Sequence, residues 1–336
     1  MQIFRFSYTS IPCLPHSVLA AGFFDGFHQG HRALLTEAKK QAERLGLPWG
    51  VLTFDPDPWA VFRPGEPLEH IQSLEDRERT AEALGANLFC ILDFTRAFAS
   101  LSPDGFHQVL KDMHVDYLVT GFDFRYGARN AGSVQSLTKA GFAHSVVQAV
   151  TDLDGKISST RIEEAVRGGN VEAAAAMLGQ DYSVPGLIVH GFGRGGKLLG
   201  FPTANLQPDP GYLLPARGVY AGFVQTDSGI HEAMISVGVN PTFTGAGQTV
   251  EAFLFDFDSD LYGQRVRFYF SRRLRPEKRF DGPEALKSQL VKDEAQSRQV
   301  LDGHDPDPDG VYATAESRQG VCRDRGRDKD MACGIK

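Results

Sequence analysis

The chain has 336 residues, of which 42% are hydrophobic and 23% charged, a composition typical of a soluble globular protein with two domains. Its net charge of −7 argues against a general nucleic-acid-binding protein, although it leaves room for a local basic pocket that holds nucleotide phosphates. The sequence contains no apolar run long enough to span a membrane, and its four cysteines form no C-x-x-C pair. Its first residues show no long apolar run with a basic flank, so we expect no signal peptide. We therefore expect a cytoplasmic protein with free thiols.

Predicted strands and helices alternate through the first half of the chain. Strands are expected at 17–24, 49–54, 87–94 and 116–124. Helices are expected at 30–46, 73–85 and 102–113, with two more between 159 and 179 that a Gly-Gly-Asn sequence separates. This alternation predicts an α/β domain over residues 1–180, with a parallel, Rossmann-like sheet and ligands at the carboxyl ends of its strands.

The second half of the chain is predicted to be an antiparallel β-barrel. Short strands separated by Gly, Pro, Asn and Asp are expected at 182–191, 218–226, 231–239, 249–257 and 264–274. A helix follows at 283–301. These elements predict a barrel domain with a terminal helix over residues 181–303. The charged, turn-rich residues 304–336 are predicted to be a disordered tail.

The stretch AAGFFDGFHQGH, residues 20–31, joins the end of a predicted strand to the start of a helix. Gly26 and Gly30 allow the backbone to approach a ligand closely. His31 falls in the first helical turn, where free N–H groups and the helix dipole favour anions. His28 and His31 could hydrogen-bond phosphate oxygens and carry positive charge toward a transition state. Two alternatives remain from the residues alone: two surface histidines at a helix start, or half of a metal site.

Four motifs in this half resemble those of a known family. GFFDGFHQGH resembles G-x-F-D-G-x-H-x-G-H, the signature of the nucleotidylyltransferase superfamily. TFDPDPW resembles T-F-D-P-H-P, GFDFRYGARNAGS resembles G-x-D-F-R-F-G-x-x-R-x-G-D, and ISSTRI resembles I-S-S-T-x-I-R. In this order they are similar to the N-terminal FMN adenylyltransferase half of the prokaryotic bifunctional riboflavin kinase/FAD synthetase family. The resemblance extends over about residues 15–300.

The resemblance implies that the FMN phosphate attacks the α-phosphate of ATP and that pyrophosphate leaves, with the protein supplying position and charge. The residues it implies for ATP are Gly22, Phe23, Asp25, His28, His31, Asp123, Ser159, Thr160 and Arg161, of which His28, His31 and Arg161 would be catalytic. Asp55 and Asp57 would lie on the FMN or metal side. Ser159 and Thr160 also fit an ordinary helix N-cap with Glu163 or Glu164 completing a capping box.

Three positions depart from the family pattern. Asp57 stands where the family has His, Glu163 where Arg is common, and Ser133 where Asp usually ends its motif. The changes at Asp57 and Glu163 make the phosphate region less cationic. An added carboxylate could hold Mg²⁺ or weaken adenylyl transfer. The alternative interpretation is therefore a riboflavin kinase with an impaired adenylyltransferase domain.

A glycine-rich stretch at residues 190–206 matches both G-x-G-x-x-G and G-x-x-x-x-G-K. Neither a Rossmann loop nor a P-loop fits, because both must open a helix and Pro202 follows closely. The stretch is better interpreted as a flap over a nucleotide, with Gly191, Gly196 and Lys197 near ATP phosphates.

GFPTANL, residues 200–206, resembles the P-T-A-N motif of riboflavin kinases. Thr203 and Asn205 alternate on an extended segment, so both oxygens face one side and suit Mg²⁺. The resemblance implies that Glu251 is the base for the riboflavin 5′-hydroxyl and that Arg275 contacts the flavin. A strand-end glutamate exposed to water is the alternative for Glu251, and a solvated strand edge is the alternative for Arg275.

These features together predict a bifunctional flavoprotein transferase that makes FMN from riboflavin and then FAD from FMN, using ATP and Mg²⁺. A flavin-binding regulator without turnover would be expected to lack Thr203, Asn205 or Glu251, and all three are present. The expected partners are riboflavin, FMN, FAD and ATP, with no nucleic acid or membrane. We expect a monomer or a weak homo-oligomer.

Overall fold

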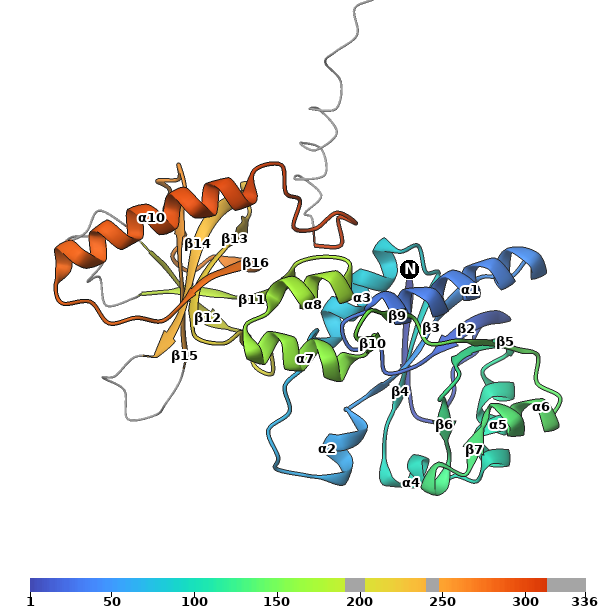
Figure 1. Cartoon of the computed structure of the whole chain (residues 1–336). Coiled ribbons are helices and arrows are strands. Elements are labelled where there is room, and N and C mark those ends of the chain that lie inside the picture. Colours follow the sequence, from blue (N-terminus) through green and yellow to red (C-terminus); the bar gives the residue numbers. More distant parts are fainter. Residues whose placement is uncertain (191–202, 240–247, 313–336) are drawn as a thin grey trace, which may run out of the picture. The chain divides into compact units, whose positions relative to one another are not determined.

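The computed structural model describes residues 1–190, 203–239 and 248–312, which form two compact units (Figure 1). The first, here the α/β unit, contains Met1–Val184 and Asp209–Ala216. The second, the barrel unit, contains the described residues of 185–208 and those from 217 onward. Residues 209–216 were expected in the barrel domain from their place in the sequence. They fold with the α/β unit instead, where the Tyr212 hydroxyl donates a hydrogen bond to Asp76.

The α/β unit is built on a six-stranded sheet in the order β1-β4-β3-β2-β5-β8, and every neighbouring pair is parallel. The strands are β1 (Gln2–Phe6), β2 (Ser17–Ala21), β3 (Trp49–Asp55), β4 (Leu88–Asp93), β5 (Val115–Gly121) and β8 (His144–Val147). The four predicted strands are the central ones. The two outer strands, β1 and β8, were not predicted, because they are partly exposed and carry no buried apolar run.

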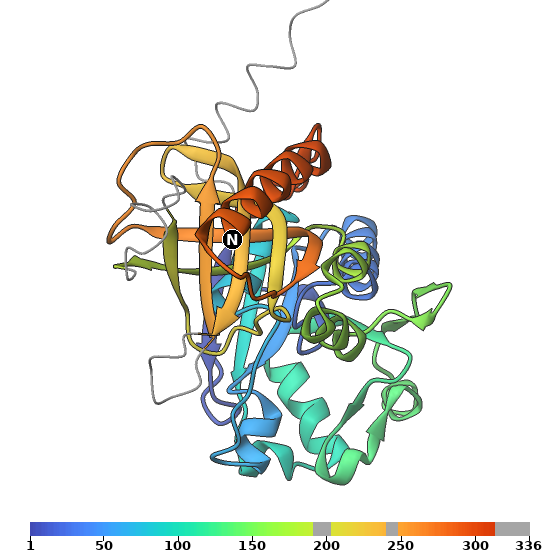
Figure 2. The same ribbon diagram turned by 60° about the vertical axis from the view of Figure 1, so that its left-hand side comes forward.

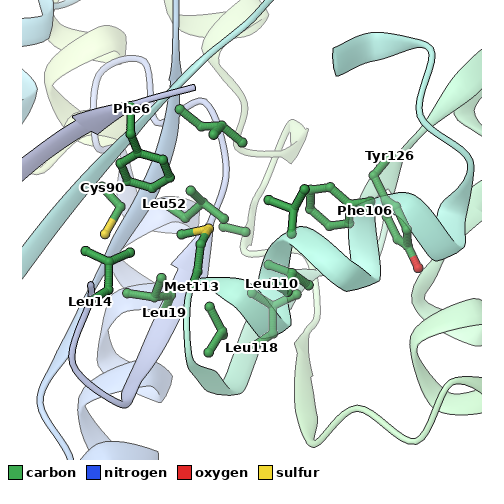
Figure 3. Close-up of a cluster of buried hydrophobic side chains, with 14 of the residues drawn as sticks. Phe6, Leu14, Leu19, Leu52, Cys90, Phe106, Leu110, Met113, Leu118 and Tyr126 are labelled. Atoms are coloured by element: carbon green, nitrogen blue, oxygen red, sulfur yellow. The ribbon is translucent and has the colours of Figure 1, made fainter. Parts of the chain in front are cut away.

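Helices cover both faces of this sheet, as predicted. Along β2, Val18 and Ala20 pack in one core while Leu19 and Ala21 pack in the other, which is the alternation expected of a strand buried on both faces. The first core includes residues of α1 (Gln29–Leu45) and α3 (Leu74–Ala83). The second core includes residues of α4 (Arg96–Ala99), α5 (Pro103–Asp112) and α6 (Val134–Lys139) (Figure 3).

Shorter elements complete the α/β unit. They are α2 (Pro58–Phe62), a 3₁₀ turn (Ala128–Asn130), the pairs β6 (Arg125–Tyr126) with β7 (Gly132–Ser133) and β9 (Thr151–Asp152) with β10 (Gly155–Lys156), and the helices α7 (Ser159–Gly168) and α8 (Val171–Leu178). The break between α7 and α8 was predicted from its glycines. It is made by Gly169, whose φ of 79° is a left-handed conformation that glycine adopts without a steric cost.

The barrel unit is a closed antiparallel barrel (Figure 2). Its strand order is β11-β12-β15-β14-β13-β16. Its strands are β11 (Tyr182–Val189), β12 (Ala204–Pro208), β13 (Gly218–Thr226), β14 (Gly229–Val239), β15 (Gln248–Leu254) and β16 (Arg265–Pro276). The first residues of β11, up to Val184, are assigned to the α/β unit. The terminal helix α10 (Pro283–Leu301) packs Leu290 and Leu301 against residues of β13 and β16. Antiparallel barrel and terminal helix are both as predicted.

Residues 304–312 are ordered, whereas the sequence predicted a disordered tail from residue 304. Val311 and Tyr312 are buried against the same core as α10. The Asp307 carboxylate accepts hydrogen bonds from the main-chain N–H groups of both, at 3.0 and 2.8 Å. The prediction failed here because composition alone hides two apolar residues within a charged stretch. Residues 313–336 lie outside the described part of the chain.

Candidate functional site

The predicted histidine motif lies at the carboxyl end of β2, where the loop after the strand leads into α1. His28 is the N-cap of α1, and its Nδ1 accepts a hydrogen bond from the His31 N–H at 3.3 Å. The rings of His28 and His31 stack with centroids 3.7 Å apart. Gly30 makes room for this arrangement, since a Cβ there would lie 3.0 Å from Cε1 of His28. The motif therefore positions two imidazoles side by side at a helix N-terminus.

A cavity of about 290 Å³ opens over these histidines, and we call it the histidine pocket. It lies near the lower end of the size range of small-molecule sites, about 300–1,000 Å³. The predicted residues that line it are Gly22, His28, His31, Asp123 and Ser159. Nδ1 of His31 is buried and has no hydrogen-bond partner among the described residues. A polar atom of a ligand in this pocket would satisfy it.

Both histidines of the pocket are neutral near pH 7. Burial, with a further contribution from Lys156, lowers the pKa of His28 to about 4. Burial, followed by His28 and then Arg77 and Lys156, lowers the pKa of His31 well below its usual value. The expectation that the pair carries positive charge is therefore corrected for the ligand-free protein. An anionic ligand would raise both pKa values, because a nearby negative charge favours the protonated ring.

The ISSTRI loop borders the same pocket, but only part of it faces the cavity. Ser159 lines the pocket, and its hydroxyl donates a hydrogen bond to the main-chain oxygen of Asp25 at 3.0 Å. This bond ties the ISSTRI loop to residues 22–28 between β2 and α1, which we call the histidine loop. The N-cap of α7 is Ser158, so the capping role considered for Ser159 and Thr160 belongs to their neighbour. Thr160 is exposed and Arg161 donates to Asp152 at 2.9 Å; neither lines the pocket.

Lys156 is a pocket residue that the sequence analysis missed. It lines the histidine pocket, pairs with Asp123, and places its ammonium group 4.9 Å from the centre of the Phe122 ring. It also lowers the pKa of both histidines, so its charge reaches the region where a phosphate would lie. A single lysine in the short hairpin before ISSTRI carries no recognisable pattern. Only its proximity to the motif could have drawn attention to it.

A second cavity of about 200 Å³ borders the histidine loop at Phe23, and we call it the carboxylate pocket. The residues that line it include Phe23, Asp55, Asp57, His70, Arg77 and Tyr212. Asp55 pairs with Arg5. Arg77 is buried, donates to the main-chain oxygen of Phe23 at 2.7 Å and lies over the Phe23 ring. Phe23 was predicted for ATP together with the histidines, and the structure places it instead in this pocket, with Asp55 and Asp57 of the predicted FMN or metal side.

The three departures from the family pattern each have a defined partner. The Asp57 carboxylate caps α2 and faces His70. Glu163 pairs with Arg167 at 3.1 Å, one turn along α7. Ser133 caps α6 through a capping box with Ser136. None of these contacts could be derived from the motifs alone.

The barrel unit brings three of its four described candidate residues together. Asn205 of β12 lies directly opposite Glu251 of β15, and the Thr203 hydroxyl donates to the Glu251 carboxylate at 3.2 Å. Arg275 lies apart from them, in an ion pair at 2.8 Å with the buried Asp293 of α10. Gly191, Gly196 and Lys197 lie outside the described residues. A carboxylate held beside a hydroxyl and an amide is a suitable arrangement for a general base next to a metal-bound phosphate.

Comparison with known proteins assigns both units to known domain families. A family model described as FAD synthetase matches residues 10–161, and one described as riboflavin kinase matches residues 178–301. Curated proteins named bifunctional riboflavin kinase/FMN adenylyltransferase from Listeria monocytogenes and Escherichia coli are 37% and 33% identical to this chain. Each alignment covers 84% of this chain and 92% of the relative. The chain belongs to the bifunctional riboflavin kinase/FMN adenylyltransferase family. The family resemblance of the four motifs and of P-T-A-N is thereby confirmed.

As a member of this family, the chain carries an FAD synthetase domain and a riboflavin kinase domain. Its fold also matches a solved structure described as that of a macrolide-efflux protein from Streptococcus pneumoniae, with a TM-score of 0.83 and 36% identity over 88% of this chain and 99% of the other. That description belongs to the other protein. Within the described ranges, no helix combines the length and the hydropathy needed to cross a bilayer.

Proposed function

We propose that this chain converts riboflavin to FMN in the barrel unit and FMN to FAD in the α/β unit, with ATP as co-substrate in both steps. The observation that carries this proposal is the pairing of each family model with its own cluster of chemically suited residues. The histidine pocket falls within residues 10–161, and the contact between Thr203 and Glu251 falls within residues 178–301.

In the kinase step, Glu251 accepts the proton of the riboflavin 5′-hydroxyl, so that this oxygen attacks the γ-phosphorus of ATP and ADP leaves. The hydrogen bond from Thr203 holds the carboxylate in one orientation. A base held within hydrogen-bond reach of its proton contributes about 10²–10⁴-fold to the rate. Arg275 stabilises the barrel through Asp293 in this proposal, and any contact of Arg275 with flavin is secondary.

Thr203 and Asn205 are the residues that would hold Mg²⁺. The side-chain oxygens of both are hard ligands, and the Thr203 hydroxyl keeps lone pairs while it donates to Glu251. In the described part of the chain, no group of three or more His, Cys, Asp or Glu side chains could hold a metal, which suits a cation bound mainly by phosphates and water. A bound Mg²⁺ would neutralise charge on the nucleotide phosphates.

In the adenylylation step, an oxygen of the FMN phosphate attacks the α-phosphorus of ATP and pyrophosphate leaves. His28, His31 and Lys156 bind the ATP phosphates, and Ser159 orients the loop that encloses them. Because the imidazoles enter neutral, each first donates a hydrogen bond and becomes more basic as the polyphosphate binds. We assign no metal to Asp55 or Asp57, because the first pairs with Arg5 and the second caps α2.

The alternative is a riboflavin kinase whose adenylyltransferase domain is impaired by Asp57, Ser133 and Glu163. The partners of these residues support the bifunctional proposal, because the two added carboxylates face His70 and Arg167 rather than an uncompensated pocket. For its setting, we propose a cytoplasmic monomer or weak homo-oligomer with small-molecule partners, which the net charge and the free thiols of Cys13 and Cys90 support.

The test follows riboflavin, FMN and FAD by chromatography after the purified protein is mixed with riboflavin, ATP and Mg²⁺. We expect FMN to rise first and then to be converted to FAD. Glu251→Gln should abolish FMN formation but still make FAD from supplied FMN, and His31→Gln should do the reverse, so that each variant controls for the other. Loss of both activities in either folded variant would refute the assignment of two sites. Accumulation of FMN without FAD in the unaltered protein would favour the alternative.

A further inference from the structure

His70 is fixed in the wall of the carboxylate pocket by its own main chain. Its N–H donates to the Gly211 oxygen at 2.7 Å, and its oxygen accepts from the Leu213 N–H at 3.1 Å. The imidazole lies against the Phe23 ring, with the two ring centres 5.8 Å apart. About a quarter of the side chain is exposed, 26%, so it reaches the cavity while its backbone is held on both sides.

Two carboxylates approach the same nitrogen of this ring. Nδ1 of His70 is 3.5 Å from Oδ2 of Asp25 and 3.9 Å from Oδ2 of Asp57. Asp25 is buried, and its carboxylate also accepts the main-chain N–H groups of Ile71 and Gln72 at 3.2 and 2.9 Å. The histidine loop, which contains Asp25, is thereby bound to the segment that contains His70.

Asp57 extends this contact to α2. Its Oδ1 accepts the N–H of Trp59 at 2.6 Å and caps the helix, while its Oδ2 faces His70. The helix exposes two large aromatic side chains, Trp59 at 57% and Phe62 at 48%. The orientation of this apolar surface therefore depends on where the Asp57 carboxylate is held.

The charges around His70 favour its protonated form. A hydrogen bond to Asp25 is the main cause that raises the pKa of His70, and the charges of Asp25 and Asp57 act in the same direction against burial and Arg77. Glu163 is close enough to interact electrostatically with both Asp25 and His70. Without the imidazole, three carboxylates would share this region with Arg77 and with the Arg167 that pairs with Glu163.

We propose that His70 is a positioning residue for adenylyl transfer that joins the histidine loop to α2 through Asp25 and Asp57. It also supplies an imidazole beside position 57, where this chain has Asp and the family pattern has His. The arrangement keeps the Asp57 carboxylate paired with His70 in the carboxylate pocket. This inference rests on the proposed FMN adenylyltransferase activity of the α/β unit.

The test measures kcat and KM for FAD formation from FMN and ATP with the full-length protein. His70→Ala should lower kcat/KM at least tenfold while riboflavin phosphorylation stays unchanged. The double variant His70→Ala/Asp57→His should recover most of this loss, because it returns an imidazole to the pocket and removes the unpaired carboxylate. His70→Gln keeps a hydrogen-bond donor without a charge, and its kcat/KM is expected to lie between those of His70→Ala and the wild type. This variant replaces His70→Ala if the alanine variant does not fold.

His16→Ala is the matched control, because it removes another His–Asp pair, to Asp116 at 2.8 Å, that lines neither pocket. It should leave FAD formation unchanged. Unchanged FAD formation in a folded His70→Ala or His70→Gln variant would overturn the inference, as would failure of Asp57→His to restore activity in the folded double variant. If the wild-type protein forms FMN and no FAD, the proposed function fails and this inference fails with it. If the wild-type protein forms FAD and the His70 variants form it equally well, only this inference fails.

Discussion

Lowering the pH from about 7.5 to about 5 is expected to destabilise the α/β unit through His28. The folded protein holds the pKa of this ring at about 4, mainly by burial, whereas the unfolded chain has the ordinary value of about 6.5. Between these two values the unfolded chain binds the proton and the folded protein does not. The contribution of the neutral His28 ring to the free energy of unfolding is therefore fully present above about pH 6.5 and is lost as the pH falls toward 4.

The magnitude follows from the two pKa values. At about pH 5, His28 is mostly protonated in the unfolded chain and mostly neutral in the folded protein. Linkage then makes the free energy of unfolding about 2 kcal/mol smaller than at neutral pH, or about thirty-fold in the unfolding equilibrium. His31 acts in the same direction, because its pKa is also lowered by burial.

The comparison variant is His28→Asn, because asparagine also caps helix N-termini and has no titrating group. The assay is urea unfolding followed by tryptophan fluorescence at both pH values. The chain has two tryptophans, Trp49 in β3 and Trp59 in α2, so the signal reports the α/β unit alone. Groups that do not interact with His28 titrate equally in both proteins and cancel in the difference. His31 does not cancel completely, because His28 contributes to lowering its pKa.

The wild type should lose about 2 kcal/mol more than His28→Asn between the two pH values. Equal losses in the two proteins would refute the argument that His28 is buried as a neutral ring. Adding ATP at about pH 5 tests the direction of the pKa shift. A polyphosphate in the histidine pocket raises the pKa of His28, so the extra loss of unfolding free energy in the wild type relative to His28→Asn should become smaller.

Two further predictions concern residues that the sequence analysis missed. Lys156→Met should raise the KM for ATP in FAD formation several-fold, because it removes the ammonium group that lines the histidine pocket. Riboflavin phosphorylation should stay unchanged, and equal KM values for the variant and the wild type in initial-rate measurements would contradict this role. Tyr312→Ala should destabilise the barrel unit by about 3 kcal/mol, because the ring is buried and lies 3.7 Å from the Arg267 guanidinium. Thermal inactivation of the kinase activity measures this loss, with Tyr312→Phe as the control. Equal inactivation of the wild type and Tyr312→Ala would argue against the anchoring of residues 304–312 to the barrel core.

The local pattern of the sequence was sufficient for most of the regular elements. The central strands β2 to β5 were predicted because each is a short apolar run, and a predicted helix follows β2, β3 and β4. The outer strands β1 and β8 were missed because a partly exposed strand has a weak apolar signal. The same limit applies to residues 304–312, where the buried apolar side chains of Val311 and Tyr312 follow three aspartates.

Contacts between neighbouring residues of one motif follow from their spacing, whereas contacts between motifs do not. His28 and His31 meet because one turn of helix α1 brings them together, which their spacing dictates. Arg161 and Thr160 were expected at the phosphates from the same motif as Ser159, and the start of α7 turns them away from the cavity. Burial also removes the expected positive charge of the two histidines, and burial depends on the packed core rather than on spacing.

The sequence by itself determined which chemistry each unit carries, because residue types and spacings within His-x-x-His, ISST and P-T-A-N depend only on neighbours along the chain. The tertiary structure decided which distant residues complete each site. Tyr212 belongs to the α/β unit because residues 209–216 return to it. His70 meets Asp57 because that segment holds the main chain of His70 and the Asp25 carboxylate holds the next two residues. Such contacts join residues far apart in sequence, and no local propensity or periodicity specifies them.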